Sequence, residues 1–202
     1  MVQAGRKLTV VAAFISGFIF PIRSQNPASL LDTAGQTTVD GRTQSYLVRH
    51  LPVNAFPELP PAIEAQLVRR GCLIPQTYQA HHPENVIHAS LERKGSSDWA
   101  VLCSVNATAS LLVFLAGSDG EPAVLATAPE ISRLQANGSS AVLGFNWAID
   151  PASPEQVHLA QLNMRHPPPR LDHDALADSV IDQKTIYRFY TRGAWTTLDT
   201  ED

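Results

Sequence analysis

Five side chains able to bind a metal ion or move a proton lie within eleven residues near the end of the chain. They are Asp172, His173, Asp174, Asp178 and Asp182. If this segment is a helical turn, Asp174 and Asp178 share one face at i and i+4, with His173 beside them. Carboxylates with an imidazole are typical of a divalent-cation site or of acid–base catalysis. The alternative is a solvated acidic helix with Asp172 or Asp174 capping its N-terminus.

A second group of imidazoles occurs upstream, at His81, His82 and His88. Neutral imidazoles in a loop and in the following strand can bind zinc or copper. Adjacent strand residues point to opposite faces, which argues against His81 and His82 sharing one ion, and the chain has no His-Glu-x-x-His sequence. We therefore expect an exposed histidine loop, with no bound metal and no cofactor. The residues to test as metal ligands are His88, His173, Asp174 and Asp178.

The chain has two cysteines, Cys72 and Cys103. They lack the Cys-x-x-Cys spacing of a redox site, and Arg70 is the only neighbouring group that would lower the pKa of either thiol. No Gly-x-Ser-x-Gly sequence marks a serine nucleophile, and residues 117–120 are typical of a turn. The catalytic residues, if there are any, are thus unknown from sequence. An even cysteine pair favours a disulfide in an oxidising compartment, with two buried free thiols as the alternative.

The alternating pattern of residues 185–198 predicts a C-terminal β-hairpin. Tyr187 and Phe189 share one face of its first strand, and Arg188 and Tyr190 share the other. Aromatic residues on strands usually pack in the core or across strands. Since one face of a single-layer hairpin stays exposed, Arg188 and Tyr190 are candidate binding residues.

The first 24 residues have the pattern of a secretory signal peptide. Arg6 and Lys7 precede the uncharged run 8–20, and Ser24 is a suitable residue before the cleavage site. The run is short of the roughly 20 apolar residues that a bilayer-spanning helix needs, although an uncleaved N-terminal anchor is the alternative. Cleavage takes the net charge from −4 to −7, because only the basic residues Arg6, Lys7 and Arg23 are lost. A mildly acidic domain does not favour nucleic-acid binding.

The remaining pattern predicts a flexible polar linker at 25–44 and a single α+β domain at 45–202. Helices are expected at 61–70, between Pro61 and the stop Gly71, and at 154–163. Strands are expected near 85–91, 99–103, 110–115, 123–126 and 141–147. Because strands mostly follow one another without intervening helices, we expect a largely antiparallel meander with one or two packing helices.

Three segments carry a resemblance to known sequences: residues 70–76 (RGCLIPQ), 98–104 (DWAVLCS) and 173–178 (HDALAD), the last followed by the 192–195 turn. Together they resemble a group of exported bacterial proteins that have no assigned function. The resemblance covers about residues 50–200. It implies export and a compact β-rich domain, and it implies no activity.

These observations predict a periplasmic or secreted protein that binds another envelope protein or a cell-envelope component without catalysing a reaction. They predict no nucleic-acid partner and no membrane span after signal cleavage. One alternative is a metal-dependent hydrolase that uses His173, Asp174 and Asp178, with His88. A second alternative is a structural subunit of a larger envelope assembly.

Overall fold

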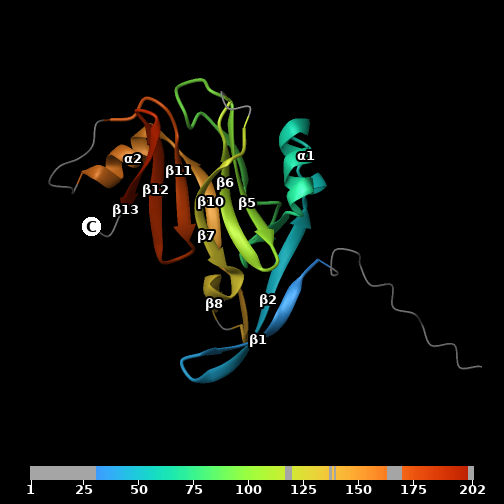
Figure 1. Ribbon diagram of the computed structural model, residues 1–202. Coiled ribbons are helices and arrows are strands. Elements are labelled where there is room, and N and C mark those ends of the chain that lie inside the picture. Colours follow the sequence, from blue (N-terminus) through green and yellow to red (C-terminus); the bar gives the residue numbers. More distant parts are fainter. Residues whose placement is uncertain (1–30, 117–119, 137, 139, 163–169, 200–202) are drawn as a thin grey trace, which may run out of the picture.

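The computed structural model describes residues 31–116, 120–136, 138, 140–162 and 170–199, which form two β-sheets and two α-helices (Figure 1). The expected signal peptide, residues 25–30 of the expected linker and residues 117–119 of the expected turn lie outside the described residues. No helix in the described ranges is long and apolar enough to cross a bilayer.

The larger sheet contains nine strands. Its main order is β7 (Ala123–Pro129), β6 (Thr108–Phe114), β5 (Asp98–Val105), β3 (Leu73–Gln76), β2 (Arg42–Pro52), β9 (Val142–Phe145) and β8 (Leu134–Ala136). In addition, β1 (Thr33–Val39) pairs with β2, and β4 (Val86–Ala89) pairs with β5. All these pairs are antiparallel except β2 with β9.

The smaller sheet is a four-stranded antiparallel meander. Its order is β10 (Trp147–Ala152), β11 (Ala175–Val180), β12 (Lys184–Thr191) and β13 (Ala194–Asp199). The β12–β13 pair confirms the hairpin predicted at 185–198. The chain passes from the larger sheet to the smaller one at Asn146, between β9 and β10. The expectation of a mostly antiparallel α+β domain is therefore confirmed, but only the smaller sheet is a simple meander.

Figure 1 shows the two sheets face to face, with α2 (Pro154–Gln161) outside the smaller sheet and α1 (Pro61–Arg70) outside the larger one. The space between the sheets is filled from both sides, for example by Leu102 and Leu111 against Trp147 and Leu176. A second apolar cluster lies under α1, and a third lies under α2. Strand β5 is therefore buried on both faces, which explains its uninterrupted apolar sequence.

Helix α1 has the predicted bounds. Pro61 occupies its first turn, where a missing N–H costs nothing, and Arg69 and Arg70 lie at its negative C-terminal end. Gly71 ends the helix with a left-handed φ of +72°, as a C-terminal glycine commonly does. Helix α2 begins with a capping box in which Ser153 and Gln156 each accept a hydrogen bond from the other's backbone N–H.

Cys72 and Cys103 form the predicted disulfide, with a Cα–Cα distance of 5.1 Å. The bond joins the residue after the α1 stop to strand β5, so it holds the helix against the outer face of the larger sheet. On the chain-entropy argument, a loop of 31 residues contributes roughly 3–4 kcal/mol to stability.

The linker prediction for residues 25–44 is wrong from residue 33 onward. Residues 33–39 form β1, and β2 begins at Arg42. The two strands turn at Asp40 and Gly41, both with positive φ, as in the tightest hairpins. The segment is polar because much of this hairpin is exposed, and a polar composition alone does not distinguish an exposed strand from a flexible chain.

Two short 3-10 helices connect these elements within the described residues. The first, η2 (Val53–Ala55), leads from β2 toward α1, and the second, η3 (Glu130–Arg133), lies between β7 and β8. Both follow a proline, Pro52 and Pro129 respectively. The second helix places a carboxylate, Glu130, in the interior of the protein.

Candidate functional site

The expected helical turn at residues 172–178 is wrong. Asp174 directly precedes β11, and Asp178 lies within it, because the segment pairs with β10 on one side and with β12 on the other. Asp178 is buried, and its Oδ1 accepts a hydrogen bond from the Trp147 indole at 2.6 Å. Its Oδ2 forms an ion pair with Arg188, 2.7 Å from Nη2. This carboxylate therefore joins three strands of the smaller sheet.

The other metal-ligand candidates are separated as well. His88 stacks on Trp99 with ring centroids 4.6 Å apart. His173 Nδ1 contacts its neighbour's carbonyl, and Asp174 Oδ2 accepts the Ser90 N–H at 3.0 Å. In the ranges that the structure describes, no three His, Cys, Asp or Glu residues come together as a metal site.

The two candidate binding residues of the hairpin already have partners within the protein. Arg188 is held by Asp178, and Tyr190 contacts the Trp195 ring edge-on at a centroid distance of 5.5 Å. The opposite face of β12 is covered, since Phe189 packs beneath α2. A binding role for Arg188 and Tyr190 stays a prediction.

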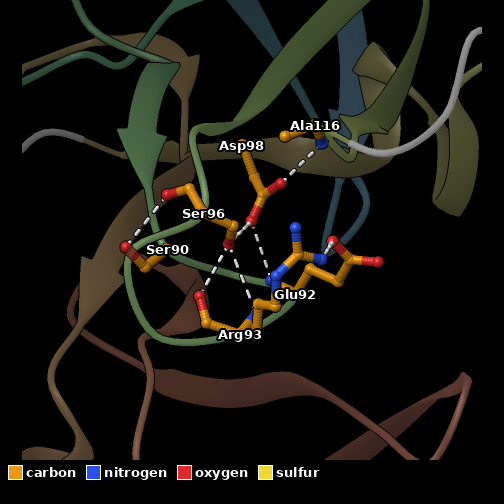
Figure 2. A network of polar contacts seen from close by, with 6 residues as sticks. All are labelled: Ser90, Glu92, Arg93, Ser96, Asp98 and Ala116. Carbon is orange, nitrogen blue, oxygen red and sulfur yellow. Dashed lines mark hydrogen bonds and ion pairs between the residues drawn. The ribbon is translucent and has the colours of Figure 1, made fainter.

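A buried carboxylate also organises the loop before β5 (Figure 2). Asp98 Oδ2 accepts the Glu92 N–H at 2.8 Å and the Ser96 hydroxyl, and its Oδ1 accepts the Ala116 N–H at 2.7 Å. Asp98 is fully buried. These hydrogen bonds all close loops on the chain itself, so the role of Asp98 is structural.

Sequence reasoning missed a serine, a histidine and a glutamate that meet in the interior. His50 Nε2 lies 2.7 Å from Glu130 Oε1, and the Ser104 hydroxyl donates to the same oxygen. In a nucleophilic triad the histidine stands between the serine and the acid, whereas here the glutamate does. All three side chains are buried, so the arrangement neither activates Ser104 nor offers it to a substrate.

The pKa of Glu130 reflects two opposing effects. Burial raises the pKa of this carboxyl, but hydrogen bonds from His50 and Ser104, together with the charge of His50, lower it below its ordinary value. His50 Nδ1 and Glu130 Oε2 have no hydrogen-bond partner among the described residues. The cluster is thus a hydrogen-bonded internal support that ties η3 to β2 and β5.

A cavity large enough for a small ligand lies where the two sheets meet. It has a volume of about 410 Å³ and is lined by eight residues of segment 77–87, by residues 148–150 of β10 and by Ile181. Ligand sites in proteins typically have volumes of a few hundred Å³ and combine apolar walls with a few polar groups. Its lining residues include the apolar Ile87 and Ile149 and the acidic Glu84 and Asp150. Among the residues that the structure describes, no lysine or arginine lines this cavity.

The floor of this cleft is held by Asn85. Its Nδ2 donates to the carbonyl of Pro75 at 2.7 Å and to that of Trp147 at 3.3 Å, while its Oδ1 accepts the Ile149 N–H at 3.0 Å. One buried side chain therefore joins β3 in the larger sheet to β10 in the smaller one. Asn85 has a φ of +70°, a conformation that asparagine tolerates better than most residues.

The outer wall of the cleft is also ordered by side chains. Gln76 Oε1 accepts the Glu84 N–H at 2.9 Å, and Gln76 Nε2 donates to the Glu84 carbonyl at 3.2 Å. Glu84 Oε2 accepts the Thr77 hydroxyl at 2.8 Å, which fixes the direction of the carboxylate. Arg49 holds the same loop through the carbonyls of Thr77 and Ala80. The exposed His82 lies at the cleft as well, so the histidine loop contributes to this site.

Comparison with protein families, with curated proteins and with solved structures finds no match for this chain. The resemblance to exported bacterial proteins stays a prediction. Sequence patterns gave no signal for Glu84 and Asp150, because the two residues lie far apart in the chain, Glu84 in the loop before β4 and Asp150 in β10.

Proposed function

We propose that this chain is exported and works outside the cytoplasm as a binding protein without catalytic activity, taking a small organic cation into the cleft between the sheets. The observation that carries the proposal is the chemistry of that cleft. Glu84 and Asp150 line it together with apolar side chains, and no lysine or arginine of the described ranges lies among them. A primary ammonium group on a short apolar body is complementary to such a surface.

Both carboxylates have capacity to bind. Among the described residues, no hydrogen bond reaches Glu84 Oε1, and Asp150 is exposed with no ion pair. Because Thr77 and Gln76 already orient Glu84, little side-chain freedom is lost when a ligand binds. A metal-dependent hydrolase is not proposed, since its expected ligands hold separate structural contacts.

Export is supported by the apolar leader and by the disulfide, which is consistent with an oxidising compartment. We expect the protein recovered from the periplasm or the medium to begin at Gln25. Mass spectrometry of the intact protein tests this. A full-length product in the cytosol with two free thiols would contradict export.

Binding is tested by titrating the purified exported protein with n-butylamine and following backbone amide signals by NMR. Signals from residues 77–87 and 148–150 should shift with n-butylamine and stay in place with butyrate, whose charge is opposite. Butan-1-ol, an uncharged molecule of similar size, measures the apolar part alone. Equal shifts with all three molecules, or shifts elsewhere on the protein, would contradict the proposal.

Two variants test the carboxylates. Asp150→Asn and Glu84→Gln should each weaken n-butylamine binding about tenfold, which corresponds to roughly 1.4 kcal/mol. Glu155→Gln is the matched control, because Glu155 is an exposed acid on α2 outside the cleft. If all three variants bind alike, the cleft carboxylates do not recognise the cation.

A further inference from the structure

Strand β1 is an outer strand with a free edge. It pairs with β2 along all seven of its residues, from Thr33 opposite Val48 to Val39 opposite Arg42. None of the other described strands pairs with its second side. Figure 1 shows the β1–β2 hairpin reaching beyond the body of the two sheets. An edge of this kind presents unpaired N–H and C=O groups that another strand can complete.

The other outer strands carry features that hinder such pairing. Strand β7 is preceded by Pro122, ends at Pro129 and has an irregular register opposite β6. In β10, Pro151 lacks an N–H, and the Asn85 side chain bonds to its backbone. Strands β8 and β4 have only three and four residues, and β13 ends at the charged Asp199. Prolines, charges, bulges and short length are the usual protections of an exposed edge.

Strand β1 has none of these protections. Its sequence, TAGQTTV, contains no charge and no proline, and its register with β2 is uninterrupted. The Asp40–Gly41 turn, with φ of +51° and +73°, fits the tight two-residue hairpin that matches strand twist. The strand is thus already formed before any partner arrives, so little conformational entropy is lost on pairing.

We propose that β1 is a dimerisation strand, through which two copies of this chain pair edge to edge and join their larger sheets across a two-fold axis. A second copy of the chain suits this edge because β1 is uncharged. Two identical β1 strands can therefore pair without placing like charges opposite each other. A two-fold axis also requires one surface to complement itself, and a free antiparallel edge does so through its alternating donors and acceptors.

Hairpin geometry says which backbone groups face the partner. In a two-residue hairpin the residues flanking the turn, here Val39 and Arg42, exchange hydrogen bonds with each other. Counting back by twos, Thr37 and Gly35 face β2, whereas Gln36 and Thr38 direct their N–H groups outward. A proline at position 36 therefore removes an outward donor and leaves the β1–β2 bonds in place.

The test is the oligomeric state of the purified exported protein, measured by sedimentation equilibrium from 5 to 500 µM. The contact is a single pair of short strands, so we expect a dimer with Kd of roughly 10–100 µM. Gln36→Pro should raise Kd at least tenfold, and Gln36→Lys should do the same by placing like charges in the contact. Thr197→Lys, an exposed change on the outer strand β13, is the control and should leave Kd unchanged.

A protein that stays monomeric at 500 µM would overturn the proposal. So would a dimer that Thr197→Lys weakens as much as Gln36→Lys does, because the contact would then not lie at β1. Unfolding curves of Gln36→Pro and Gln36→Lys at 2 µM, where the protein is monomeric, check that the variants keep their fold. This test does not involve the cleft, so dimerisation and cation binding can fail independently.

Discussion

His50 Nε2 lies 2.7 Å from Glu130 Oε1, and both side chains are almost fully buried, with relative exposures of 2% and 3%. The pair joins β2 of the larger sheet to the short helix η3. A buried carboxylate that accepts hydrogen bonds is costly to leave without its partner.

Acid should weaken the fold partly through Glu130. Because its pKa is lower in the folded state than the ordinary value of 4.5, the folded protein holds this proton less tightly than the unfolded chain does. The stabilisation is therefore complete above about pH 4.5 and is lost as the pH falls through the folded-state pKa. Urea unfolding between pH 7 and pH 3 should show this loss in the wild type, and a smaller one in Glu130→Gln. An unchanged pH profile in that variant would contradict the assignment, and Glu155→Gln is the exposed control.

Removal of the disulfide should destabilise the protein without changing its fold. The double variant Cys72→Ser, Cys103→Ser is expected to lose roughly 3–4 kcal/mol of unfolding free energy, because the unfolded chain regains the freedom of the 31-residue loop. Urea unfolding of the wild type with and without reductant gives the same comparison in one protein. If reductant leaves the wild-type midpoint unchanged, the cross-link does not contribute in this way.

The buried side chain of Asn85 should contribute strongly to the free energy of unfolding. Asn85→Gly keeps the left-handed backbone and deletes three buried hydrogen bonds, for an expected loss of about 2–4 kcal/mol. Asn85→Ala should lose roughly 1 kcal/mol more, because alanine disfavours a φ of +70°. Thermal and urea unfolding measure both variants. Stability equal to wild type in Asn85→Gly would mean that the bridge between the sheets is dispensable.

Gly144 is required by a close approach rather than by its backbone angle. A Cβ at this position would lie 2.4 Å from the Cβ of Tyr78, so one of the two segments would have to move. Gly144→Ala should therefore cost about 1–3 kcal/mol of stability. Gly120→Ala, where an added Cβ meets nothing within 4 Å, is the matched control and should be nearly neutral. Equal unfolding midpoints for the two variants would contradict the packing argument.

Local features of the sequence determined local structure. Pro61, Gly71 and the charges between them specify α1, and the alternation and Arg192–Gly193 turn specify the β12–β13 hairpin. Two cysteines leave one intramolecular pairing, so the disulfide was also predictable. The helix ends and the hairpin depend on residues close together in the sequence, and the disulfide depends on the number of cysteines. None of these three features depends on how distant parts of the chain pack.

Tertiary structure alone decided which distant residues meet. The same aspartates that look like a metal site in a helix are separated once residues 175–180 form a strand, and Asp178 then pairs with Arg188. Glu130 reaches His50 because η3 lies between β7 and β8 of the same large sheet that contains β2. Glu84 and Asp150 line one cleft only because the two sheets stack. The alternation of a strand predicts which side chains share a face, but it does not predict which other sheet covers that face. The packing of the two sheets therefore decided where the buried Asp178 and the cleft lie.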